Sequence, residues 1–132
     1  MIENQIHQAI REKQTAKGEL FCVSAFQIAG ALDVEPLAVG QAADEMGARL
    51  SRCQLGLFGY GPKAEGRHRI VEPADEVAPE LEQAIKDRVG EKGLSCKAAW
   101  EIAASLDLRK MQVASAAETL EIKIVRCQLG AF

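Results

Sequence analysis

Four cysteines are the residues of this sequence best suited to metal or redox chemistry: Cys22, Cys53, Cys96 and Cys127. Zinc sites are normally built on thiolates that include a closely spaced pair such as C-x₂-C, and this sequence has none. A thiol among apolar neighbours behaves as a small hydrophobic side chain. We therefore expect the four cysteines to be reduced and structural, with no metal and no cofactor. A redox-switchable pair or a metal site is the alternative.

The other reactive side chains give little support for catalysis. The two histidines, His7 and His68, fall at the start of a predicted helix and in a loop, with no repeated nucleophile or acid beside them. No glycine-rich phosphate loop follows a predicted strand. We expect a protein that is not an enzyme and has no catalytic residues.

A loop over residues 59–69 is rich in Gly and Pro and carries a cluster of cationic groups. Lys63, Arg67 and Arg69 are suited to contacts with phosphate, and His68 joins them only when it is protonated. The alternative is an ordinary solvated loop, because charged side chains are common on protein surfaces.

The elements that would position these groups follow from an internal repeat. Residues 22–58 align with residues 96–132 at a constant offset of 74 and without a gap, and one deletion upstream changes the offset to 75. Both copies close on the same run, Arg-Cys-Gln-Leu-Gly. The sequence therefore predicts three parts: a first repeat over 1–58, a wing, strand and acidic linker over 59–80, and a second repeat over 81–132 that lacks a wing.

Each copy begins with the pattern of an amphipathic helix. Apolar residues recur at every fourth position within residues 2–10 and again within residues 77–89, which is the spacing of one helix face. Glycine often follows the last turn of a helix, so we expect these helices to end at Gly18 and Gly93.

Two further helices and two strands are predicted in each copy. The helices flank a tight turn at Asp33 or Asp107, where a short polar side chain suits the backbone, and Pro36 suits the first turn of the third helix. A short strand is expected before the second helix, and a longer one after the third helix, over residues 49–57 and 123–131.

Residues 28–39 resemble the helix-turn-helix of bacterial transcription regulators. In that motif a small residue lets the two helices cross closely, which Ala29 matches, and a branched apolar residue locks the second helix, which Val39 matches. The motif's turn usually prefers Gly, where this sequence has Asp33 and Asp107. With a strand on either side, the whole resembles a winged helix. The expected fold is mainly α with small β-hairpins, arranged as two tandem winged-helix/helix-turn-helix repeats.

The resemblance implies that the third helix of each copy enters the major groove of DNA. In the first copy, among the positions 36–38, 40 and 41 expected to face the bases, Gln41 alone can hydrogen-bond a base edge, while Leu37 and Ala38 offer apolar contact suited to a protein partner. The second copy is richer in polar groups. The predicted DNA-contacting residues are Arg109, Lys110, Gln112, Ser115, Gln41, Lys63, Arg67 and Arg69.

The final strand, over residues 122–132, has no wing on which to fold back. An unpaired strand exposes a row of N–H and C=O groups and invites association. We expect it to pair either with the first copy's sheet or with the same strand of a second chain. The second arrangement makes a homodimer, which is the oligomer we favour.

Composition limits the classes of function. The net charge of −3 argues weakly against non-specific binding to nucleic acid. No apolar run approaches the roughly 18 residues of a membrane span, and the N-terminus has no signal-peptide pattern, so we expect a cytoplasmic protein that does not enter membranes.

The expected function is a DNA-binding transcription regulator acting on double-stranded DNA. The first alternative is a protein-interaction module that keeps the fold and presents the third helix and the Arg-Cys-Gln-Leu-Gly strand to a partner. The second alternative is a thiol- or metal-responsive regulator.

Overall fold

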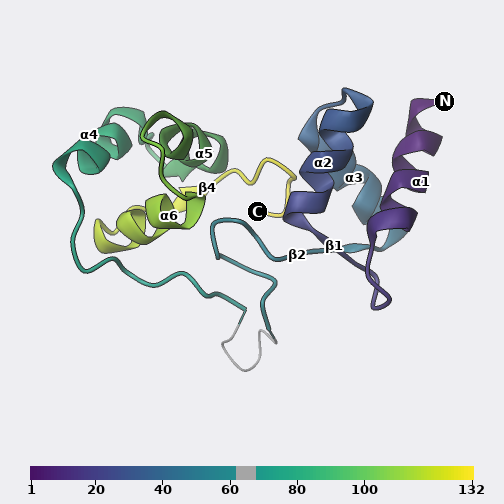
Figure 1. The fold of residues 1–132 in the computed structure, drawn as a ribbon, viewed down its shortest axis with the longest axis horizontal. Helices are drawn as coiled ribbons and strands as arrows, with labels where there is room; N and C mark the ends of the chain where they lie inside the picture. The colour runs from purple at the N-terminus through teal and green to yellow at the C-terminus, as the bar shows by residue number, and fades with distance from the viewer. Residues whose placement is uncertain (62–67) are drawn as a thin grey trace. The chain divides into compact units, whose positions relative to one another are not determined.

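The computed structural model of the chain describes residues 1–61 and 68–132 and is mainly helical (Figure 1). Its internal contacts divide the chain into two compact units. Unit 1 consists of Met1–Cys53, Phe58–Arg69 and Gln128–Ala131, and unit 2 of Gln54–Leu57, Ile70–Cys127 and Phe132. Each unit therefore contains most of one repeat together with a four-residue segment from the Arg-Cys-Gln-Leu-Gly region of the other.

Unit 1 is built on three helices that contact one another, seen side by side in Figure 1. They are α1 (Ile2–Lys13), α2 (Cys22–Leu32) and α3 (Pro36–Met46). Ile10, Ile28 and Val39 contribute one buried side chain from each helix, as the apolar spacing of the sequence predicts. These three side chains place the core of the unit between the helices.

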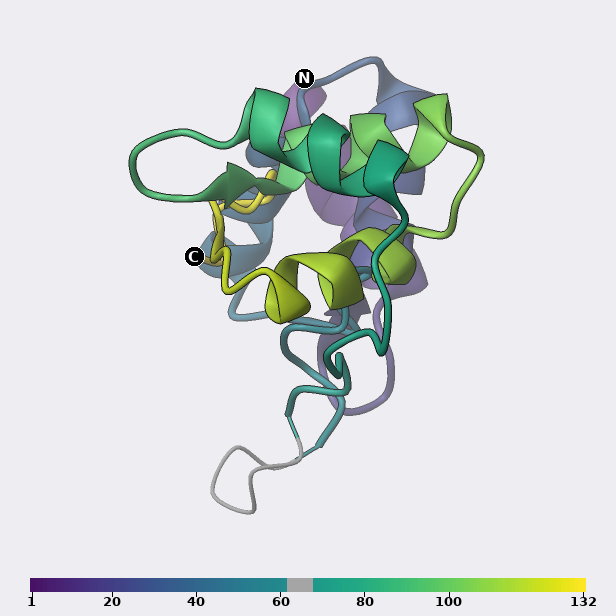
Figure 2. The same ribbon diagram turned by 90° about the vertical axis from the view of Figure 1, so that its left-hand side faces the viewer.

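Unit 2 repeats this arrangement, and Figure 2 turns it toward the viewer, with α4 in teal and α6 in yellow-green. Its helices are α4 (Pro79–Arg88), α5 (Cys96–Ser105) and α6 (Lys110–Thr119). Ile85, Ile102 and Val113 are the buried counterparts of the three core residues of unit 1. The repeat seen in the sequence is thus a repeat of core positions.

The turn between the second and third helix has the same backbone in both units. Asp33 and Asp107 both have a left-handed φ of 55°, which Asp adopts more readily than most residues. The chain changes direction by 118° between α2 and α3, and Pro36 lies at the start of α3. The predicted tight turns are confirmed.

The strands differ from the expected hairpins. Each is two or three residues long, and each pair runs parallel: β1 (Glu19–Phe21) with β2 (Arg49–Ser51), and β3 (Leu94–Ser95) with β4 (Ile124–Val125). Parallel partners need a long crossover, which the two intervening helices provide in each unit. The prediction of small β-hairpins was therefore wrong for these strands.

The expectation that the last strand lacks a partner within its own repeat was also wrong. β4 pairs with β3 inside unit 2, because the two intervening helices, α5 and α6, bring the chain back beside β3. After β4 the chain turns at Arg126, which has a left-handed φ of 53°, and the Cys127 N–H donates to the Phe132 carbonyl oxygen at 3.1 Å. The first repeat makes the same turn, with the Cys53 N–H donating to the Phe58 oxygen at 3.2 Å.

The first helix of each repeat ends before the expected glycine. α1 ends at Lys13 and α4 at Arg88, because the next residue in each case takes an extended backbone. Gly18 lies in the turn that leads into β1, where its N–H donates to the Thr15 oxygen at 2.9 Å. Gly93 occupies the corresponding turn before β3, with φ of 140°.

No single helix within residues 1–61 and 68–132 is both long and apolar enough to cross a membrane. The pair α2 and α3 reaches that length and composition only when taken together, across the 118° bend.

Candidate nucleic-acid interface

The start of α6 brings together three of the predicted DNA-contacting residues. Arg109 is the N-cap residue and is exposed, and Lys110 is the first residue of the helix. The Gln112 side-chain oxygen accepts the Arg109 backbone N–H at 2.7 Å, while the Gln112 backbone N–H donates to the Arg109 carbonyl at 3.0 Å. These two bonds satisfy groups that a helix terminus otherwise leaves unpaired. The amide nitrogen of Gln112 keeps its capacity to donate to a base edge.

Lys110 is held against an aromatic ring. Its ammonium nitrogen lies 4.6 Å from the centroid of the Trp100 ring, within the range of a cation–π contact. Lys110 is half-buried, and the ring contact restricts its side chain before any ligand binds. The side chain would therefore lose less conformational entropy on binding a phosphate.

Ser115 lies farther along α6, beside the extended segment that precedes α4. Its carbonyl oxygen accepts the Ala74 N–H at 3.1 Å, and the Thr119 hydroxyl donates to the Ala74 oxygen at 2.6 Å. These bonds join residue 74 to the C-terminal half of α6 and leave Ser115 half-buried. Ser115 therefore lies about one turn beyond Gln112 on α6, next to the segment that contains residue 74.

The corresponding face of α3 is partly covered. Gly40 is buried against the backbone of Leu129, a residue of the tail segment that belongs to unit 1, and Gly130 lies against the Leu37 side chain. Gln41 is exposed, and the helix contains no Lys or Arg. Of the positions expected to face the bases, Gln41 alone offers a group that can read a base edge.

In unit 2 a short segment likewise lies against the third helix, α6. Gly56, from the Gln54–Leu57 segment, lies against the Met111 side chain, and its carbonyl oxygen accepts the N–H groups of Ile70 and Val71. Met111 is the repeat equivalent of Leu37, and Gly56 is that of Gly130. The two glycines of the repeated run thus occupy matching positions on the third helices of the two units.

The predicted wing lies only partly within the described residues. Lys63 and Arg67 fall outside them. Arg69 is exposed, and the His68 carbonyl oxygen accepts the Tyr60 N–H at 3.2 Å, which brings the two ends of the loop together.

No protein-family model, no curated protein and no solved structure matches the chain.

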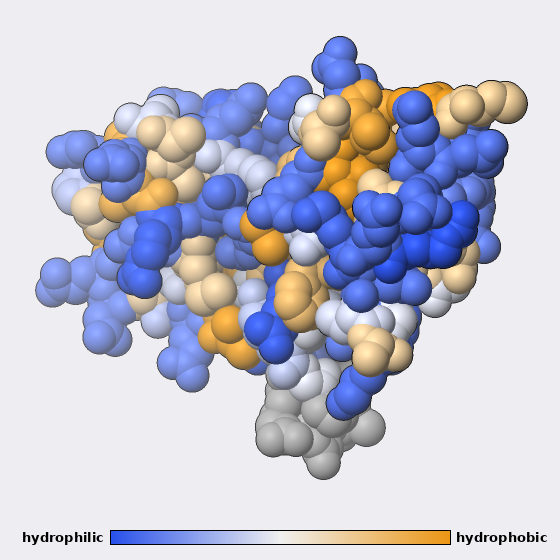
Figure 3. Space-filling view, turned by 45° about the vertical axis from the view of Figure 1, so that its right-hand side comes forward, coloured by the Kyte–Doolittle hydropathy of each residue, from blue (hydrophilic) through white to orange (hydrophobic). Residues whose placement is uncertain are grey.

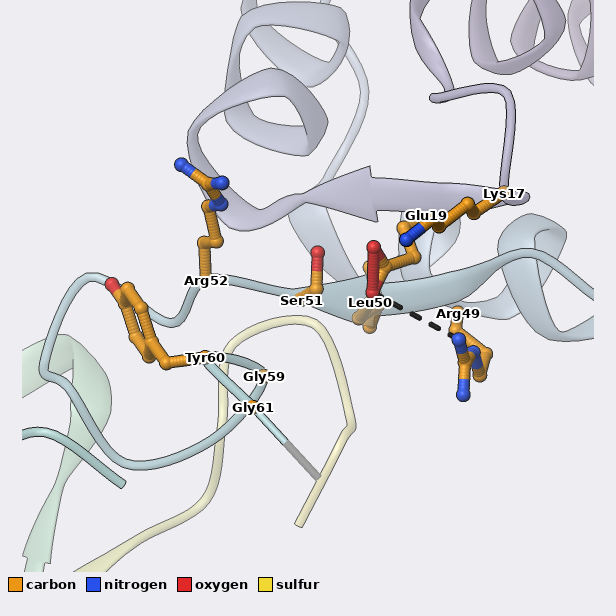
Figure 4. Close-up of a pocket in the computed structure, with 9 residues that line it drawn as sticks. All are labelled: Lys17, Glu19, Arg49, Leu50, Ser51, Arg52, Gly59, Tyr60 and Gly61. Atoms are coloured by element: carbon orange, nitrogen blue, oxygen red, sulfur yellow. Dashed lines mark ion pairs between the residues drawn. The ribbon is translucent and has the colours of Figure 1, made fainter. Parts of the chain in front are cut away.

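A second set of cations lies in unit 1 and was not among the predicted contact residues (Figure 4). Lys17, Arg49 and Arg52 line a pocket of about 510 Å³ together with Ser51 of β2 and the Gly59–Gly61 segment. A signal for this set is present in the repeat, because the equivalents of the three cations are Lys92, Lys123 and Arg126.

Tyr60 closes one side of this pocket. Its hydroxyl donates to the Cys53 carbonyl oxygen at 2.6 Å. Burial raises the pKa of Tyr60 above 10.0, electrostatic interaction with Cys53 and Cys22 raises it further, and the positive charge of Arg52 lowers it. Tyr60 is therefore a protonated structural donor at neutral pH.

The cysteines are thiols placed one per equivalent site in the two units. Cys22 and Cys96 each begin a helix, Cys53 follows β2, and Cys127 follows β4. No group of three or more His, Cys, Asp or Glu side chains that could hold a metal ion occurs in the described part of the chain.

Proposed function

We propose that this protein binds double-stranded DNA through its helix-turn-helix repeats and acts as a transcription regulator. The observation that carries the proposal is the 118° change of direction between α2 and α3 across the left-handed Asp33. Helix-turn-helix motifs join their two helices by a short turn at about 90–120°. Asp107, in the turn between α5 and α6, has the same φ as Asp33. We also propose that the fold is of the winged-helix type, with the loop after β2 serving as the wing.

The start of α6 supplies the contacts. Arg109 and Lys110 place two positive charges at the end of the helix that enters the groove in this class of protein, and the Gln112 amide can donate to a base acceptor. Arg69 adds a phosphate contact from the wing. We assign no phosphate contact to α3, which has no Lys or Arg and is partly covered by the segment that contains Leu129.

Binding to a fluorescent DNA duplex of mixed sequence, measured by anisotropy between about 50 and 200 mM salt, tests the proposal. The affinity should fall steeply with salt because bound cations displace counterions from the phosphates. Arg109→Ala should lower the slope by about 1, as expected for one lost phosphate contact. Arg11→Ala removes the same charge from an exposed position on α1 and should leave the slope unchanged. Absence of binding near 50 mM salt, with protein in the tens of micromolar range, contradicts the proposal, since non-specific dissociation constants are about 10⁻⁴ to 10⁻⁶ M.

A protein-interaction module is the second candidate. It is favoured by the exposed apolar residues of unit 1, among them Val23 of α2 and Leu37 of α3. Figure 3 shows an apolar area over unit 1 within a largely hydrophilic face. On this view helix α3 meets a protein, and the DNA titration gives no binding.

A further inference from the structure

The pocket of unit 1 has the composition of a phosphate site. Lys17 comes from the loop before β1, and Arg49 and Arg52 come from β2 and the turn after it, so three cations from two segments line one space. In Figure 4 the Ser51 hydroxyl and the Arg52 side chain point to one side of the chain and Arg49 points to the other, while Lys17 extends from the loop before β1 toward Glu19 and Leu50. Arg52 is held by its contact with Phe21, whose ring centroid lies 4.5 Å from the guanidinium carbon.

Ser51 gives the second, independent observation. The residue is 2 % exposed, and its buried hydroxyl oxygen has no hydrogen-bond partner among the described residues. A buried hydroxyl without a partner is less stable than one that makes a hydrogen bond. An anion that entered the pocket and accepted this hydrogen bond would supply the missing partner.

The charge balance of the pocket favours an anion. Glu19 is the one acidic residue of the lining, and its carboxylate lies 3.9 Å from an Arg49 nitrogen, so the pair is loose and exposed on the arginine side. Three cations against one carboxylate leave a net charge of +2. The other polar side chain, Tyr60, donates its hydroxyl to the Cys53 carbonyl and is not available to a ligand.

We propose that this pocket, lined by Lys17, Arg49, Arg52 and the Ser51 hydroxyl, binds a phosphate group. Arginine and lysine bind phosphate through charge-assisted hydrogen bonds, and a hydroxyl adds a neutral one. The phosphate comes either from the backbone of DNA, in which case the site extends the proposed function, or from a small phosphorylated ligand. The pocket can hold a phosphate group whether or not the protein binds DNA.

The second repeat supplies matched controls. It keeps the cation equivalent to Lys17 as Lys92, but it has Val125 where the first repeat has Ser51. Ser51→Val therefore introduces a side chain that the repeat already accommodates, and Lys92→Gln makes the same chemical change as Lys17→Gln in the other unit.

Titration of the full chain with inorganic pyrophosphate, followed by the backbone amide resonances of residues 49–52 and 59–61, tests the proposal. We expect these resonances to shift on binding. Lys17→Gln should weaken binding about tenfold and Ser51→Val about threefold, the sizes expected for losing a charged and a neutral hydrogen bond. Lys92→Gln should have no effect. A folded protein without such shifts, or equal weakening by Lys17→Gln and Lys92→Gln, overturns the proposal.

The same variants tested on the DNA duplex identify the source of the phosphate. If Lys17→Gln lowers the salt slope of DNA binding by about 1 and Ser51→Val weakens DNA binding, the pocket holds a backbone phosphate. If both variants lose pyrophosphate but bind DNA normally, the ligand is a small phosphorylated molecule. If the wild-type chain binds pyrophosphate but no DNA, the phosphate site is supported and the proposed DNA-binding function is contradicted.

Discussion

Gly40 of α3 lies so close to Leu129 that a Cβ atom at residue 40 would come within 1.8 Å of the Leu129 carbonyl oxygen. Both residues belong to unit 1, although 88 residues separate them in the chain. The contact places the Gln128–Ala131 segment on the face of α3 that a helix-turn-helix protein turns toward DNA. Because the obstructing atoms are backbone, a larger residue at position 40 cannot be accommodated by a side-chain rotation.

Gly40→Ala should destabilise unit 1. Overpacking of this kind typically costs about 1–3 kcal/mol, which exceeds the roughly 1 kcal/mol that alanine gains over glycine in a helix. Urea unfolding measures the change, and hydrogen exchange at residues 128–131 should become faster as the segment is displaced. Gly30→Ala is the control, because nothing lies within 4 Å of a Cβ at that position of α2. It should be neutral or stabilising, and equal stability of the two variants would show that the contact is absent.

Tyr60 should lower the stability of the protein at alkaline pH. Its pKa is raised above 10.0, first by burial and then by the two cysteines, so the folded state holds the proton more tightly than the unfolded state. The corresponding stability is fully present below pH 10 and is lost as the pH rises through the folded pKa.

The chain has a single tyrosine, so tyrosinate absorbance reports on this residue alone. The titration midpoint should lie above 10.0 in the native protein and near 10 in denaturant. Tyr60→Phe should lower stability at neutral pH by about 1 kcal/mol, through loss of the bond to the Cys53 carbonyl, and should flatten the alkaline decline. A native midpoint at or below the denatured one would refute the account.

The four thiols should differ in reactivity. Cys22, Cys53 and Cys96 are buried, whereas Cys127 is half-buried in the turn after β4. A thiol reagent added to the native protein should modify Cys127 first and the other three only as the units open. Mass spectrometry of the time course identifies the site, and Cys127→Ser should abolish the fast phase. Two or more cysteines reacting at the same fast rate would contradict this order.

The helices could be predicted because their information is local. Apolar residues at every third or fourth position fix which face is buried, and Asp33 and Asp107 mark the turns by the backbone conformation that their side chains tolerate. The offset of 74 then carried each assignment from one copy to the other. Helix ends were less well determined, because Gly18 and Gly93 serve the turns that follow the helices.

The features that were missed depend on contacts between distant residues. Nothing near Gly40 in the sequence indicates that Leu129 will cover it, and the resemblance to a hairpin-bearing fold gave the wrong strand direction. The pocket in unit 1 joins Lys17 to residues more than 30 positions away. Its one sequence signal was the recurrence of the three cations in the second copy, which composition alone does not reveal.

Lys110 should have two separable roles, one in stability and one in binding. Its ammonium lies 4.6 Å from the centroid of the Trp100 ring, and Trp100 is the single tryptophan of the chain. Lys110→Ala should lower stability by about 0.5–1 kcal/mol and change the tryptophan emission, because the cation leaves the ring.

If the start of α6 contacts DNA, Lys110→Ala should also lower the salt slope of binding by about 1. Lys110→Arg keeps both the charge and the ring contact and should change neither the emission nor the slope appreciably. Arg109→Ala should reduce the slope and leave the emission as it is, since no contact joins Arg109 to the ring among the interactions described for α6. An unchanged emission in Lys110→Ala would show that Lys110 does not contact the Trp100 ring. An unchanged salt slope in both Lys110→Ala and Arg109→Ala would exclude DNA docking through the start of α6.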